Sequence, residues 1–273
     1  MPSASLLPII LSMLLTGLAS GVLAGMLGVG GGIIVVPALE FALRYAEVPV
    51  EARMHVAVAT SLATIIPTSM ASARAHYARG AVNLGLARAW GVAVFAGATL
   101  GSLLAARASA HWLTAIFGGV ALVVGLKMLL PLDHWRLAQR PPQGSAGKLL
   151  GVCIGALSAV MGIGGGTLAV PTLTLTGEPI HRAVATSALF GLLISVPGTL
   201  VYLLARPAQS VNAYSVGYVS LIGVLLIAPG SWLAAPYGAK LAHAMSKRSL
   251  SMAFGGFLLL VATRMIYRTL TAA

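Results

Sequence analysis

The sequence predicts an all-α protein that crosses a membrane several times. Hydrophobic residues make up 58% of the chain and charged residues 8%, with a mean hydropathy of +0.95. A soluble globule of 273 residues needs more polar surface than this. Helices are favoured over a barrel because alternating strands of about ten residues are absent, and every backbone polar group in lipid needs an internal partner.

A glycine-rich segment occurs twice, which predicts two repeats. Residues 28–37 read GVGGGIIVVP, and residues 162–171 read GIGGGTLAVP. A second echo follows each copy, HVAVATS at residues 55–61 and HRAVATS at residues 181–187. Such self-similarity indicates an internal duplication.

We therefore expect three parts along the chain. A first transmembrane repeat spans residues 1–131, a cytoplasmic linker 132–148, and a second transmembrane repeat 149–273. The linker is hydrophilic and contains the turn-forming sequence RPPQGS. Each repeat holds about five apolar segments, and in order along the chain these segments are residues 5–27, 32–43, 56–73, 89–106, 112–130, 149–161, 166–177, 183–205, 214–236 and 249–267.

The first two apolar segments are expected to be separate helices. As one helix, residues 6–45 would be about 60 Å long at about 1.5 Å per residue, roughly twice the ~30 Å hydrocarbon core. Glycine disfavours helix interiors and permits unusual backbone angles, so the break falls at the glycine cluster. Gly28, Pro37, Gly162 and Pro171 are the expected hinge residues. Each proline either kinks its helix or begins it after an extended stretch.

Basic residues between the apolar segments set the orientation. If each pair of segments returns the chain to the side from which it came, most Lys and Arg side chains fall on one face, which is then cytoplasmic, with both termini outside. The two halves then enter the membrane from opposite sides as an inverted repeat. Treating each pair as a single crossing gives a weaker charge bias.

Paired helix breaks in inverted halves predict a transport site near the membrane midplane. A helix that begins inside the membrane offers unpaired N–H groups and roughly +0.5 charge, so two converging ends bind an anion without a buried cation. The alternative for the glycines is close helix packing, and for the hydroxyls a bond to their own helix. The expected substrate-binding residues are Gly30, Gly31, Gly32, Thr60, Ser61, Gly164, Gly165, Gly166, Thr167, Thr186 and Ser187.

Other residues are candidates for coupling, entry or packing. Glu40 is the acid inside an apolar segment and the candidate for proton coupling, the alternative being an ordinary interfacial carboxylate. His76 and Arg79 are candidates for steering anions at the cytoplasmic mouth. His55 is expected at the interface, close to Glu51. Packing is expected of the glycines that recur at four-residue spacing, which are Gly17, Gly21, Gly25, Gly97, Gly101, Gly151 and Gly155.

Enzyme signatures are missing. Neither glycine cluster fits G-x-G-x-x-G, because Ile33 or Thr167 takes the sixth position, and neither ends in the Gly-Lys-Ser/Thr of a phosphate loop. The sequence has no G-x-S-x-G nucleophile and no histidine pair at metal spacing. We expect no enzyme activity, cofactor or metal. The net charge of +12 lies in short connections between apolar segments, so nucleic acid is not an expected partner.

The repeated motifs resemble the sulfite exporter TauE/SafE family of bacterial membrane proteins. The resemblance rests on GMLGVGGG at residues 25–32 leading to Val36-Pro37, VATS at 58–61, His76 with Gly80-Ala81-Val82, and the second-half counterparts. It implies a multi-pass inner-membrane transporter that exports sulfite, sulfoacetate or related organosulfonates. Asn83 stands where family members often have an acid.

The expected function is therefore a secondary transporter of a small sulfur-containing anion, working by alternating access. The first alternative is a passive anion channel, which would use the same site. The second, from another class of protein, is a membrane-embedded enzyme or an assembly subunit. The lipid bilayer is the expected surrounding. Protons as coupling ion and a homo-oligomer are partners that the sequence leaves open.

Overall fold

The computed structural model describes residues 6–27, 31–46, 48–130, 138–207, 214–244 and 247–271. These residues form ten helices and one two-stranded hairpin. The helices are α1 (Leu6–Leu27), α2 (Gly32–Tyr45), α3 (Val50–Ala78), α4 (Leu84–Arg107), α5 (Ala110–Leu129), α6 (Gly144–Met161), α7 (Gly166–Leu175), α8 (Ile180–Leu204), α9 (Leu221–Ala244) and α10 (Lys247–Thr271), and the strands are β1 (Ser215–Val216) and β2 (Val219–Ser220).

The prediction of an all-α polytopic membrane protein is confirmed. Among the described residues, six segments are long and apolar enough to cross a membrane, namely α3, α4, α5, α6, α8 and the first part of α9, residues 221–238. Every apolar segment expected from the sequence holds one helix. Their ends follow local chemistry: Asn83 Oδ1 accepts a hydrogen bond from the Leu86 amide at the start of α4, and Ser109 caps α5 in the same way.

Several helix boundaries differ from the expectation by a few residues, and two of these differences change a predicted connection. Helix α6 begins at Gly144, so the last residues of the expected linker are helical. The segment expected at residues 214–236 opens with the β1–β2 hairpin, and α9 begins only at Leu221. Hydropathy alone does not reveal this hairpin, because Val216 and Val219 are as apolar as the residues of a membrane-spanning helix. The rest of the linker falls partly at residues 131–137, outside the described part.

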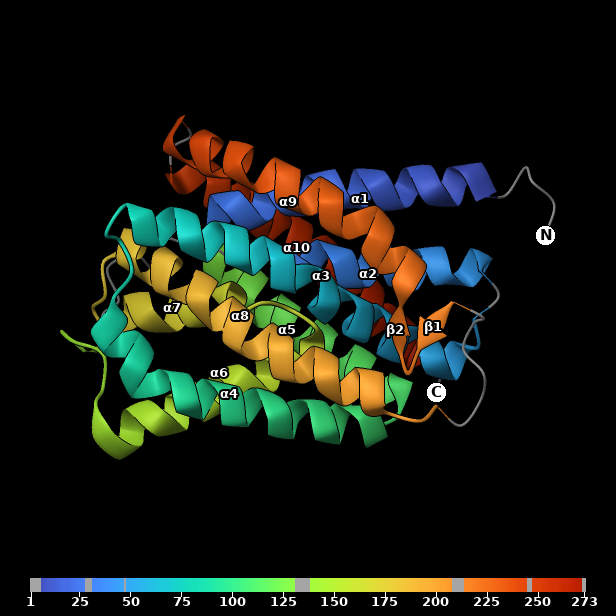
Figure 1. Cartoon of the computed structure of the whole chain (residues 1–273), viewed down its shortest axis with the longest axis horizontal. Coiled ribbons are helices and arrows are strands. Elements are labelled where there is room, and N and C mark those ends of the chain that lie inside the picture. The colour runs from blue at the N-terminus through green and yellow to red at the C-terminus, as the bar shows by residue number, and fades with distance from the viewer. Residues whose placement is uncertain are drawn as a thin grey trace.

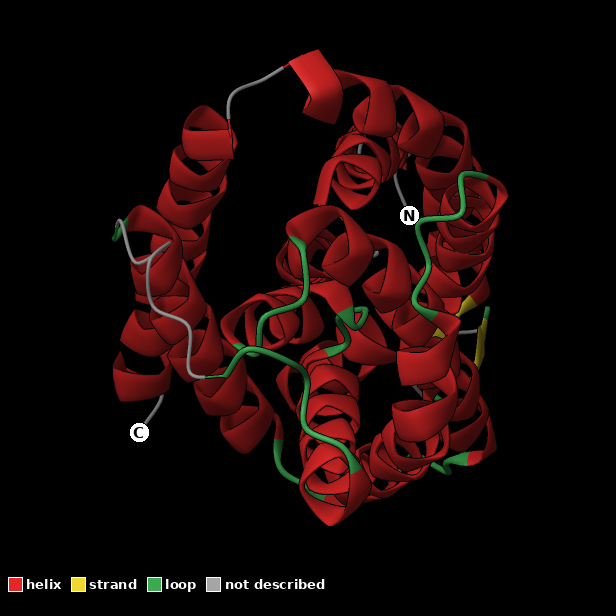
Figure 2. Cartoon of the chain, turned by 90° about the vertical axis from the view of Figure 1, so that its left-hand side faces the viewer, coloured by secondary structure: helices red, strands yellow, loops and turns green. Residues whose placement is uncertain are grey.

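Helices of the two halves pair with each other (Figure 1). Extensive contacts join α1 to α9, α4 to α6, α3 to α8 and α5 to α10. If α6 to α10 are taken as the counterparts of α1 to α5, exchanging the two halves turns the α1–α9 pair into the α6–α4 pair. The α3–α8 and α5–α10 pairs are each unchanged. Turned by 90°, the helices are seen gathered in one bundle (Figure 2).

The expected packing glycines build two of these pairs. A β-carbon added at Gly17 would lie 2.6 Å from the Ile227 carbonyl oxygen, and one at Gly21 would lie 2.6 Å from Ser231 Cα. In the same way Gly101 meets Ala156 on α6. Because only glycine allows backbones this close, the packing prediction for Gly17, Gly21 and Gly101 is confirmed.

Helix directions follow from successive contacts. Gly17 and Gly21 meet Ile227 and Ser231, so α1 and α9 run parallel. By contrast α3 and α8 are antiparallel, since Gly191 lies against Ser69 while Gly198 lies against Leu62. Helices α5 and α10 are also antiparallel. The long helices α3 and α8 thus form the centre, with α3 the most deeply buried of the candidate spans.

Candidate functional site

The chain breaks its helices at both glycine clusters. Helix α1 ends at Leu27 and α2 begins at Gly32, while α6 ends at Met161 and α7 begins at Gly166. Gly31 has a φ of 74° and Gly162 a φ of 66°, the left-handed region that favours glycine. In Figure 1, α2 turns back toward the end where α1 began, and α7 likewise turns back after α6. The predicted residues Gly28 and Gly30 lie outside the described part.

The two breaks contact each other in the protein interior. A β-carbon added at Gly32 would lie 2.9 Å from Ile163 Cα and would collide with the Gly162 carbonyl oxygen. That carbonyl accepts a hydrogen bond of 2.7 Å from the Ser61 hydroxyl on α3. All described glycines of both clusters are buried. The structure therefore brings the two breaks into contact, the start of α2 against the end of α6, and keeps them away from the surface.

The short helices begin directly at the glycines, and their prolines follow inside. Pro37 lies within α2 and Pro171 within α7. This decides between the two alternatives left by the sequence, because residues 33–36 and 167–170, which precede the prolines, are helical rather than extended. Without an N–H, each proline also leaves one carbonyl of the preceding turn without its helical donor. The first N–H groups of α2 and α7 have no acceptor within their own helices either.

Thr167 places a polar side chain at the start of α7. It stands in the first turn of α7, is 3% exposed, and its hydroxyl has no hydrogen-bond partner among the described residues. Next to it, Gly165 packs on α8, where an added β-carbon would lie 2.9 Å from Phe190 Cβ. A buried hydroxyl without a partner costs free energy in the empty protein. Such a group beside unpaired N–H donors is typical of a ligand site.

The other predicted hydroxyls make bonds inside the protein. Thr60 accepts from the Ser220 amide and Thr186 from the Asn83 amide, each at 3.0 Å. Ser187 donates to the Ala183 carbonyl one turn back in its own helix, the alternative that the sequence left open. With Ser61 donating to the Gly162 carbonyl, all four hydroxyls are engaged in hydrogen bonds within the protein.

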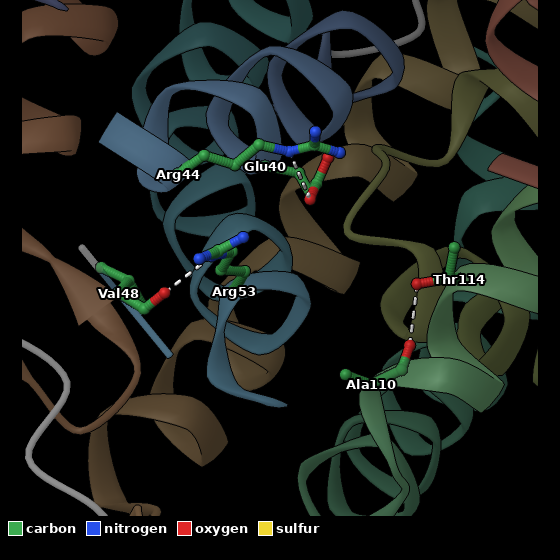
Figure 3. Close-up of polar contacts among 6 residues, drawn as sticks. All are labelled: Glu40, Arg44, Val48, Arg53, Ala110 and Thr114. Atoms are coloured by element: carbon green, nitrogen blue, oxygen red, sulfur yellow. Dashed lines mark hydrogen bonds and ion pairs between the residues drawn. The ribbon is translucent and has the colours of Figure 1, made fainter. Parts of the chain in front are cut away.

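Glu40 lies on α2 beyond its proline. It is 3% exposed, and its Oε1 lies 3.7 Å from Arg44 Nε one turn further along (Figure 3). Nearby, Arg53 of α3 donates to the Val48 carbonyl at 2.7 Å and closes the turn between α2 and α3. Glu40 is thus a buried, paired carboxylate near the C-terminal end of α2, about two helical turns from the break.

His76 and Arg79, the residues predicted for the mouth, lie close together at the end of α3. Both line a cavity of about 30 Å³ between α1, α3 and α9, together with Gly25, Ser72 and Pro236. His76 is half-buried and Arg79 exposed at the end of α3. Since one water molecule needs at least about 10 to 15 Å³, the cavity has room for about two. It lies directly beside the end of α1, which leads to the first break.

These features define a class of protein: a multi-pass membrane transporter with paired helix breaks that meet in its interior. The chain belongs to the sulfite exporter TauE/SafE family, whose model matches residues 13–265. Curated relatives carry names of the same class. A probable membrane transporter protein of Haemophilus influenzae is 30% identical, covering 95% of this chain and 98% of its own. The probable membrane transporter protein YunE of Bacillus subtilis is 27% identical, covering 92% and 95%.

The similarity extends to archaea. A probable membrane transporter protein of Methanocaldococcus jannaschii is 27% identical over 93% of this chain and 92% of its own. No solved structure matches the chain. The predicted transport class and membrane location are thus confirmed, and the relatives are named as transporters rather than enzymes.

Proposed function

We propose that this chain is a secondary transporter that exports a small sulfur-containing anion, such as sulfite, sulfoacetate or another organosulfonate, across the bacterial inner membrane. The observation that carries the proposal is the meeting of the two helix breaks, with Gly32 against Ile163, together with the buried hydroxyl of Thr167, which has no partner among the described residues. The family name supplies the substrate class.

The anion is held by backbone groups in this proposal. The N–H groups at the starts of α2 and α7 point out of their helices and carry partial positive charge. Gly31, Gly32 and Gly165 let the backbone at the breaks pack closely against Ser20, Ile163 and Phe190, and Thr167 adds a hydroxyl donor. A sulfonate or sulfite has several acceptor oxygens and no donor at its charged end, which matches a site made of donors alone.

The two halves form an inverted repeat that moves around this site. The antiparallel pairs α3 with α8 and α5 with α10 support the inversion, because each pair consists of counterpart helices. Alternating access then follows from rocking one half against the other. In this proposal the end of the bundle that carries the cavity at His76 and Arg79 faces the cytoplasm, where Arg79 attracts the anion. Glu40 is the proposed proton-coupling residue.

Transport and binding assays test this proposal. Purified protein in proteoliposomes is loaded with sulfite, sulfate, thiosulfate, sulfoacetate or taurine, and flux is followed with and without an opposing anion gradient. Saturable flux with exchange supports a carrier, whereas steady unsaturated current supports a channel. A substrate recovered chemically changed supports an enzyme. Preference for an uncharged solute over all the anions contradicts the electrostatic argument.

Glycine variants locate the site. Gly31→Val and Gly165→Val should abolish flux, since both positions have no room for a side chain. The matched control is Gly119→Val on α5, where an added β-carbon meets nothing within 4 Å. Full flux in either site variant would contradict the proposed role of the breaks.

A further inference from the structure

Two loops at opposite ends of the bundle have the same construction. One joins α3 to α4 and reads Gly80-Ala81-Val82-Asn83, and the other precedes α9 and reads Gly217-Tyr218-Val219-Ser220. Both glycines have a positive φ, 64° at Gly80 and 57° at Gly217. In Figure 1 the β1–β2 hairpin lies at one end of the bundle and the α3–α4 connection at the other.

The hydrogen bonds of the two loops also correspond. The Ala81 amide donates to the His76 carbonyl at the end of α3, as the Tyr218 amide donates to the Tyr202 carbonyl near the end of α8. The last residue of each loop caps the next helix. Asn83 accepts from the Leu86 amide at 3.1 Å, and Ser220 from the Gly223 amide at 3.2 Å.

Each loop is tied to the half of the protein to which it does not belong. The Ser220 amide of the second half donates to Thr60 on α3, and the Asn83 amide of the first half donates to Thr186 on α8. Both threonines are fully buried. A buried amide needs an acceptor, so each threonine holds one loop in place across the interface between the halves.

We propose that Thr60 with Ser220 and Thr186 with Asn83 are two latches that close the opposite ends of the transport path. This inference rests on the proposed transport function and assigns positioning residues to it. A motion of one half against the other must lengthen one latch to open that end. Both latches are formed in this structure, which corresponds to an occluded state.

Further contacts distinguish the two ends. Asn83 Nδ2 also donates to Glu178 Oε1 at 2.9 Å, so the α4 latch is reinforced by a carboxylate. At the other end the Tyr218 ring stacks on His55 at 4.9 Å, and His55 Nε2 lies 2.9 Å from the Ala108 carbonyl oxygen. His55 is buried, and its Nδ1 lies 3.1 Å from the carbonyl oxygen of Glu51, the residue that the sequence placed beside it. The two loops therefore make the same hydrogen bonds to the opposite half. They differ in the additional side-chain contacts that hold them.

Hydrogen exchange measured by mass spectrometry on the full chain in lipid nanodiscs tests the latches without a substrate. Thr60→Val removes the acceptor and should speed amide exchange in residues 214–223 by about five-fold or more. It should also slow exchange in residues 79–86, because opening one end favours closure of the other. Thr186→Val should give the reverse pattern, and Thr60→Ser should restore the wild-type pattern.

The matched control is Thr64→Val on the same helix as Thr60. Thr64 is also buried, but its hydroxyl donates to the Ser61 carbonyl of its own helix at 2.8 Å. Thr64→Val should change the amide exchange of neither loop. Local acceleration without the reciprocal slowing would make these bonds merely structural and overturn the proposal. If the reciprocal pattern is found and no sulfur-containing anion is transported, the proposed function fails and the latches stand.

Discussion

Thr167→Val separates a binding role from a structural role most sharply. The change removes a hydroxyl and keeps the branched shape of the side chain. A hydrogen bond to a charged acceptor contributes about 1.5 to 3 kcal/mol, so losing it should weaken anion binding by about 10- to 100-fold. The empty protein should respond in the opposite sense. Because the hydroxyl is buried without a partner among the described residues, its removal should stabilise the apo state by about 1 kcal/mol.

The assay measures both quantities on the same sample. Calorimetric titration with sulfite and sulfoacetate gives Kd, and thermal unfolding without ligand gives Tm, which should rise by about 2 °C. Thr172→Val is the control on the same helix, since the Thr172 hydroxyl donates to the Leu168 carbonyl at 2.7 Å and should affect binding little. Unchanged binding together with a lower Tm in Thr167→Val would refute the assignment of this hydroxyl to the site.

Three further changes test packing, the second break and coupling. Gly21→Ala forces a methyl group against α9 and should lower stability by about 1 to 3 kcal/mol in thermal unfolding, while Gly256→Ala, which meets nothing within 4 Å, should not. Ser61→Ala removes the hydrogen bond to the Gly162 carbonyl and should lower the free energy of unfolding by about 1 to 3 kcal/mol. The same Tm in the variant and the wild type would contradict this. Glu40→Gln should abolish anion flux driven by a pH gradient and leave anion exchange intact; loss of both would remove Glu40 from coupling.

The sequence predicted the fold class and the helix breaks because both have strong local signals. An apolar run of spanning length has few alternatives to a helix, and the triple glycines cannot continue one favourably. The packing role of Gly17 and Gly21 followed from their four-residue spacing alone. The convergence of the breaks needed one further assumption, the inversion of the halves, and in the structure Gly32 does lie against Ile163.

The roles of the hydroxyls depended on contacts that the sequence does not encode locally. Thr60 and Thr186 had the right polarity for substrate donors, but their oxygens accept from amides far away in the chain, at Ser220 and Asn83. A repeated Gly-x-Val followed by a polar residue was the available signal for these loops, and it is too short to notice before the loops are seen side by side. Thr167 was predicted only as one hydroxyl among five, and burial without a partner is what separates it from the others.

The exchange of partners between the halves means that both halves contribute to the proposed site. Helix α1 packs through Gly17 and Gly21 on α9, and α4 packs through Gly101 on α6, so each half completes the packing of the other. Neither half alone covers its glycine surfaces, since their contacts are backbone atoms of the opposite half. The two breaks meet at this same interface, where Gly32 lies against Ile163. Any motion between the halves therefore acts directly on the groups proposed to hold the anion, which physically links the fold to the proposed alternating access.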